Sequence, residues 1–127
     1  MASELEKYRE IFRAAFRRDK FRCVYCDKDL LCSLDSFAGM HLDHLKPAKL
    51  SGPDLELFNR VSACSTCNSL KGSFDPIPGE EISDANFKVA LESAKSFVSE
   101  KRKGSIPTSY YRDYQYWLEE SGRAHDG

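Results

Sequence analysis

The fold is decided by two pieces of sequence that a polar loop connects: Met40-His-Leu-Asp-His-Leu-Lys-Pro47 and Asn59-Arg-Val-Ser-Ala-Cys-Ser-Thr-Cys-Asn-Ser-Leu-Lys-Gly72. They bring together histidine, aspartate, asparagine and cysteine, residue types that bind metals and transfer protons. The first piece partly alternates apolar and polar residues, which predicts a short strand over 39–45 that the proline ends. The second predicts a short helix that begins at its first cysteine and that the glycine stops.

Two Cys-x-x-Cys pairs flank the first of these pieces, Cys23 with Cys26 and Cys64 with Cys67. Four thiolates are a complete tetrahedral ligand set for a structural zinc ion. The pairs lie further apart than in a zinc ribbon, so we expect a functional segment to be looped out between them. Chance spacing and a redox pair stay open as alternatives. The fifth cysteine, Cys32, is expected to be a small buried residue.

The length and composition favour one globular domain over 1–127. We expect a metal-binding core at about 21–74, an N-terminal helix at about 3–18 and C-terminal helices at about 83–121. No apolar run is long enough to cross a bilayer, and no signal peptide is recognisable. A cytoplasmic protein without a membrane partner is therefore expected. The net charge of −1 does not by itself point to nucleic acid.

The N-terminal helix is predicted by apolar residues at helical spacing after a capping box of Ser3 and Glu6. Its outer side and the residues after it are basic: Arg9, Arg13, Arg17, Arg18, Lys20 and Arg22. A solvated helix face and a face that binds phosphates are both open at this point.

The C-terminal helices carry two signals. A basic run before Gly104 is typical of a helix end, and an aromatic run follows it: Tyr110, Tyr111, Tyr114 and Trp117. The aromatic helix leaves two roles open, a homodimer contact or a cap on the core.

The motifs between Cys23 and Gly72 resemble those of the HNH endonucleases. The resemblance rests on Leu-Asp-His-Leu-Lys-Pro at 42–47, on Asn59, and on Cys-x-x-Cys-Asn-x-x-Lys-Gly at 64–72, in this order around the upstream cysteine pair. It implies an α+β fold with a small ββα-metal core and a four-cysteine zinc site, flanked by an N-terminal helix and C-terminal helices.

The resemblance also implies a role for each motif residue. Asp43 and Asn68 would bind a divalent metal ion, although many family members have histidine where this chain has Asn68. His44 would be the general base that activates water, and Asn59 would brace the loop that orients it. Oxygen ligands suit Mg²⁺ or Mn²⁺, whereas thiolates suit Zn²⁺.

The implied activity is metal-dependent hydrolysis of DNA phosphodiester bonds, by nicking or cutting the duplex, with 5′-phosphate and 3′-hydroxyl products. The alternative is a non-catalytic zinc-ribbon-like module that binds nucleic acid or protein.

Contacts with DNA phosphates are expected from three basic residues near the motif. Lys71 follows Asn68 by three positions and would share its helix face, and Lys46 and Arg60 flank the site. Two roles stay open for His41: it could contact metal or phosphate, or it could be an ordinary surface histidine.

Overall fold

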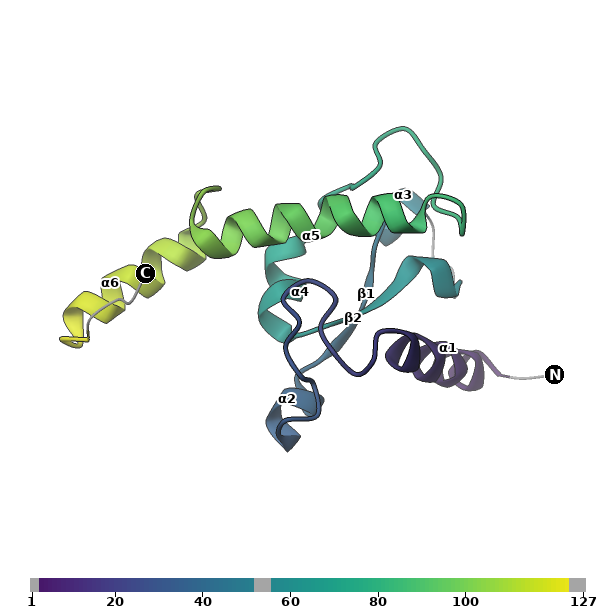
Figure 1. Cartoon of the computed structure of the whole chain (residues 1–127), viewed down its shortest axis with the longest axis horizontal. Coiled ribbons are helices and arrows are strands. Elements are labelled where there is room, and N and C mark those ends of the chain that lie inside the picture. Colours follow the sequence, from purple (N-terminus) through teal and green to yellow (C-terminus); the bar gives the residue numbers. More distant parts are fainter. Residues whose placement is uncertain (1–2, 52–55, 124–127) are drawn as a thin grey trace.

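The computed structural model describes residues 3–51 and 56–123. Its centre is a two-stranded antiparallel sheet of β1 (His41–His44) and β2 (Arg60–Ala63), in which His41 pairs with Ala63 and His44 pairs with Arg60. Helix α4 (Ser65–Lys71) follows β2 directly, so the chain forms a ββα unit (Figure 1). The predicted α+β class, with a small ββα core, clustered cysteines and flanking helices, is confirmed.

The sheet is short, and its two strands differ in burial, because β1 has one buried residue, Leu42, whereas β2 is buried throughout. All four residues of β2 are buried, and Val61 and Ala63 are fully so. Leu45 continues β1 into the core, and its backbone N–H donates to the Asn59 carbonyl at 3.0 Å. A two-stranded sheet is marginal alone, so the surrounding elements must supply most of its stabilisation.

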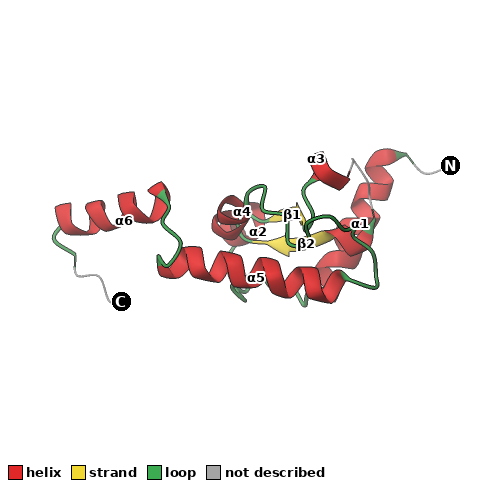
Figure 2. Cartoon of the chain, turned by 90° about the horizontal axis from the view of Figure 1, so that it is seen from above, coloured by secondary structure: helices red, strands yellow, loops and turns green. Residues whose placement is uncertain are grey.

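Helices on either side of the ββα unit complete the core. Helix α1 (Glu4–Arg18) contacts β2, with Ala15 and Phe16 buried, and its N-cap Ser3 accepts from the Glu6 N–H at 3.2 Å. Helix α5 (Phe87–Lys103) packs across α4 rather than parallel to it (Figure 2) and buries a row of small apolar residues, namely Ala90, Ala94 and Val98. Three short elements connect these parts: α2 (Leu34–Ala38), α3 (Ala48–Ser51) and the 3-10 helix η1 (Leu57–Asn59).

Helix α5 begins later than the apolar periodicity predicted. The Asn86 side chain accepts from the Ser83 N–H at 2.8 Å and donates to the Glu81 carbonyl at 2.8 Å, which holds the preceding residues in a turn. The helix ends as predicted at Gly104, whose φ of 83° lies in the left-handed region that favours glycine.

Helix α6 (Ser109–Glu120) extends away from the sheet beyond the end of α5 (Figure 1). None of its residues is buried, and Tyr110, Tyr114 and Trp117 are more than half exposed. Helix α6 is therefore not a cap on the core. The expected burial of Cys32 is also wrong, because this thiol is exposed beside the Ser36 hydroxyl. No helix in the described part of the chain is both long and apolar enough to span a bilayer.

Candidate metal centre and active site

The four paired cysteines converge on one point. Their sulfur atoms all lie within 4.8 Å of one another, and the sulfurs of Cys26 and Cys64 are 3.8 Å apart. Four sulfurs about 2.3 Å from a tetrahedral zinc ion would be separated by about 3.8 Å. Cys23, Cys64 and Cys67 are buried, and all four are free thiols. The cluster is therefore compatible with a structural zinc ion.

The loop that carries the first cysteine pair is fixed to the sheet. Cys23 and Asp27 close it with two backbone hydrogen bonds, from the Cys23 N–H to the Lys28 carbonyl and from the Asp27 N–H to the Cys23 carbonyl, both at 2.9 Å. The Val24 N–H donates to the Ser62 carbonyl of β2 at 3.0 Å. We call residues 23–28 the cysteine knuckle. The second pair needs no such loop, because Cys64 is the N-cap of α4 and Cys67 lies in its first turn.

Arg102 of α5 adds a positive charge to this cluster. Its Nε donates to the Cys67 sulfur at 3.1 Å and its Nη2 lies 3.6 Å from the Cys64 sulfur. Burial opposes the guanidinium charge, but the sulfur contacts outweigh it and hold the pKa of Arg102 above its usual range. Four thiolates on one Zn²⁺ leave a net negative charge that this arginine would offset. The basic run at this helix end was interpreted only as a C-terminal signal, so the sequence did not predict the contact.

Asp43 is held by a tyrosine from the cysteine knuckle. The Tyr25 hydroxyl donates to Asp43 Oδ2 at 2.7 Å, and Tyr25 is only 3% exposed. Burial raises the pKa of Asp43, and the Lys71 charge and the Tyr25 hydrogen bond oppose this rise. Since Tyr25 lies between Cys23 and Cys26, the metal cluster and this carboxylate are joined by one side chain. No sequence signal assigned Tyr25 a partner in another element.

Lys71 lies behind Asp43 and His44 rather than at the surface. It is 1% exposed, and its Nζ donates to the His44 carbonyl at 3.3 Å. Burial lowers the pKa of Lys71, while the charges of Asp43 and Asp75 act in the opposite direction. Asn68 is half-buried one turn earlier on the same helix. The hydrogen bond from Lys71 thus fixes α4 against the end of β1.

Asn59 holds the turn that follows His44. This side chain is fully buried, its Oδ1 accepts from the Lys46 N–H at 2.7 Å, and its Nδ2 donates to the Lys46 carbonyl at 3.0 Å. A side-chain amide that satisfies both backbone groups of one residue fixes that residue's orientation. The chain is therefore clamped two positions after His44.

The structure places the three basic residues that were expected to contact DNA inside the protein. Lys46 is 6% exposed and forms an ion pair with Asp75 at 2.8 Å, and Arg60 is 9% exposed and donates to the Leu42 carbonyl at 3.3 Å. Lys71 is buried as described above. A cation that binds a phosphate must be reached from solvent, so these three side chains are better described as internal partners. His41, in contrast, is exposed.

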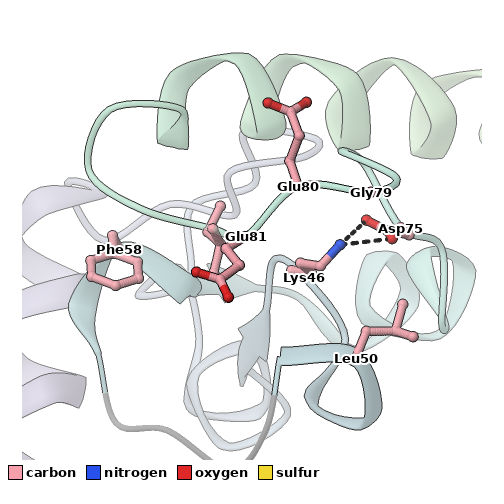
Figure 3. Close-up of a pocket in the computed structure, with 8 residues that line it drawn as sticks. Lys46, Leu50, Phe58, Asp75, Gly79, Glu80 and Glu81 are labelled. Atoms are coloured by element: carbon pink, nitrogen blue, oxygen red, sulfur yellow. Dashed lines mark hydrogen bonds and ion pairs between the residues drawn. The ribbon is translucent and has the colours of Figure 1, made fainter.

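A cavity of about 520 Å³ lies beside the Lys46–Asp75 pair (Figure 3). Its lining includes Phe58 and Leu50 as well as the acidic residues Asp75, Glu80 and Glu81. The one lysine in the lining already binds a carboxylate. This side of the molecule would therefore repel a phosphate backbone.

Comparisons with known proteins bear on the segment that holds this site. Residues 23–74 match a family model described as HNH endonuclease. A search of curated proteins gave no match. A search of solved structures gave none either. The matched segment contains the cysteine knuckle, both strands and α4. Residues 23–74, less than half of the chain, are therefore similar to the HNH endonuclease family.

Proposed function

We propose that this protein is a metal-dependent endonuclease that hydrolyses phosphodiester bonds of duplex DNA. The observation that carries the proposal is the fixed environment of two adjacent residues at the end of β1. Asp43 is held by Tyr25, the carbonyl of His44 is held by Lys71, and the following turn is held by Asn59. Fixed geometry of this kind is what a general base needs, because it must reach the proton that it removes.

His44 is the proposed general base. Histidine is the side chain most often used as a general base, because a neutral imidazole can accept a proton from an attacking water. His44 is half-buried at the last position of β1, and its Nε2 is buried, so the accessible part of the ring does not include this nitrogen. Asn59 would act as a positioning residue, since it contacts the backbone after His44 and not the reacting atoms.

Asp43 and Asn68 are the proposed protein ligands of a divalent ion. Burial raises the pKa of Asp43, so a nearby cation would stabilise its charged form. Asn68 lies one turn before Lys71, whose charge interacts with Asp43, and residues three apart share a helix face. Carboxylate and amide oxygens suit Mg²⁺ or Mn²⁺. When bound, such an ion would stabilise charge on the phosphate and on the leaving oxygen.

The test is plasmid cleavage in the presence of Mn²⁺ or Mg²⁺. We expect the parent protein to convert supercoiled plasmid to nicked or linear DNA, and His44→Ala to lose about 10²- to 10⁴-fold in rate because it lacks the general base. His41→Ala removes the exposed imidazole at the other end of β1 for comparison; because the His41 charge acts on Asp43, we expect a loss there too, but a much smaller one than for His44→Ala.

Zinc content and a cooperative thermal melt would show that each variant is folded. A folded, zinc-loaded parent without any cutting activity would favour the alternative, a zinc-ribbon-like module that only binds nucleic acid or protein. Equal cutting by the parent and His44→Ala would remove His44 from the mechanism.

A further inference from the structure

Three arginines form a line along α1. Arg9, Arg13 and Arg17 follow one another at intervals of four residues, so they lie on one side of the helix. All three are exposed. We call these three residues the α1 stripe. The whole chain has a net charge of only −1, so the stripe is a local concentration of positive charge.

No stripe residue forms an ion pair within the described part of the chain. The ion pairs among residues 3–51 and 56–123 join Arg18 to Asp19, Lys46 to Asp75 and Lys103 to Glu100, and none includes a stripe residue. Like charges four residues apart repel one another and weaken a helix. Glu6 and Glu10 stand three positions before Arg9 and Arg13, but none of the ion pairs of the described residues joins them to the stripe, so the guanidinium groups keep their donors for an external anion.

The stripe also has a rigid attachment close to the proposed active site. At the C-terminal end of α1, Arg18 donates to the carbonyls of Leu57 and Arg60, and Asp19 accepts from the Ser62 N–H at 2.8 Å. Arg60 is the cross-strand partner of His44. From this anchor α1 projects outward, with the N-terminus at its far end (Figure 1).

The dimensions of the stripe fit a nucleic-acid backbone. Arg9 and Arg17 are eight residues apart, which is about 12 Å along a helix. One strand of duplex DNA has a phosphate about every 3.4 Å along its axis, so the stripe can face three or four phosphates. Arginine presents a planar fork of donors that matches phosphate oxygens better than a lysine ammonium does.

We propose that the α1 stripe binds the phosphate backbone of duplex DNA and holds it beside residues 23–74. The inference rests on the proposed function for its choice of partner. It assigns to α1, which lies outside the matched segment, the electrostatic role that the sequence had assigned to three lysine and arginine residues now known to be buried. Contacts of this kind give affinity that does not depend on sequence.

The experiment measures duplex binding by fluorescence anisotropy at several salt concentrations. All proteins carry His44→Ala so that the DNA stays intact. In this background Arg9→Gln, Arg13→Gln and Arg17→Gln are combined. Each lost phosphate contact lowers the slope of log K against log salt by roughly 1, so the triple variant should lose about 3 in slope. Binding should weaken equally for duplexes of unrelated sequence.

Two further variants make the result specific. A control combines Lys88→Gln, Lys95→Gln and Lys103→Gln, which remove the same charge from exposed positions on α5. This control should keep the parent slope, because its charges are not expected to touch DNA. Replacing the stripe arginines with lysines should also keep the slope but lower the affinity.

The outcomes separate this inference from the proposed function. An unchanged slope for the stripe variant, or an equal loss in the α5 control, would overturn the role of the stripe even if the parent with His44 intact cuts plasmid. A stripe-dependent slope without any cutting by that parent would uphold the stripe and overturn the nuclease proposal. A parent that neither binds nor cuts DNA would overturn both.

Discussion

The contact between Tyr25 and Asp43 allows a sharp test of the metal ligand. Tyr25→Phe removes one hydroxyl group and keeps the aromatic ring in its buried position. The lost interaction is a hydrogen bond of 2.7 Å to a carboxylate. Hydrogen bonds to charged groups contribute about 1.5–3 kcal/mol, and about 1.4 kcal/mol corresponds to a factor of ten in an equilibrium constant.

We therefore expect the affinity for Mn²⁺ to fall by about 10- to 100-fold, because Asp43 would lose the group that orients it. Partners of metal ligands generally have effects of this size. The rate at saturating Mn²⁺ should change much less, since the Tyr25→Phe substitution leaves His44 and its supporting contacts in place.

The assay is a Mn²⁺ titration with two readouts, the rate of plasmid cleavage and direct binding to the protein by calorimetry. Because Tyr25 lies between two zinc-site cysteines, the zinc content of the variant must equal that of the parent before the data are compared. Tyr116→Phe, at a position 53% exposed on α6, is the control for loss of a tyrosine hydroxyl. Unchanged Mn²⁺ binding by fully zinc-loaded Tyr25→Phe would refute the orienting role of the hydroxyl.

Three other substitutions probe the contacts that support the site. Arg102→Met should weaken zinc binding by about 10- to 100-fold in a chelator competition, whereas Lys103→Met should not, because only Arg102 touches the cysteine sulfurs. Asn59→Ala leaves the buried N–H and carbonyl of Lys46 without these hydrogen bonds and should lower the free energy of unfolding by about 2–4 kcal/mol in urea titrations; a smaller effect than 1 kcal/mol would contradict the clamp. Burial would raise the pKa of Asp75, but the hydrogen bonds from Lys46 outweigh burial, and the pKa is lowered. The ion pair therefore stabilises the fold above the ordinary carboxylate pKa of about 3.9. This stabilisation is lost as the pH falls through the lowered pKa of Asp75. Asp75→Asn should thus cost about 1–3 kcal/mol at pH 7 and flatten the acid side of a melting-temperature profile; an unaltered profile would show that the ion pair contributes little.

The metal cluster and the central fold could be predicted because their signals are local. A Cys-x-x-Cys spacing already restricts how two sulfurs can approach one ion. The partial alternation over 39–45 indicates a strand, in which the structure buries Leu42 and Leu45. Helix α1 was likewise signalled by its own cap and periodicity. The approach of the two cysteine pairs spans 38 positions, and it could be expected only because four thiolates complete one tetrahedral site.

The surroundings of the site could not be predicted in the same way. The sequence does not distinguish a lysine that faces solvent from one that binds a buried carboxylate. The acidic partner of Lys46 lies 29 positions away in the chain. The contact of Arg102 with Cys67 spans 35 positions, and that of Tyr25 with Asp43 spans 18. Such pairs are set by tertiary packing. The catalytic roles of His44, Asp43, Asn59 and Asn68 stay predictions, of which the cleavage assay tests that of His44.

The cysteine knuckle has a consequence for the order in which the molecule assembles. Two consecutive residues of the knuckle reach different strands, since the Val24 N–H binds β2 and the Tyr25 hydroxyl binds β1. A pair of strands this short has little tendency to associate unaided. Capture of zinc by the thiols would thus precede strand pairing, and the yield of native protein would follow the supply of free zinc during synthesis.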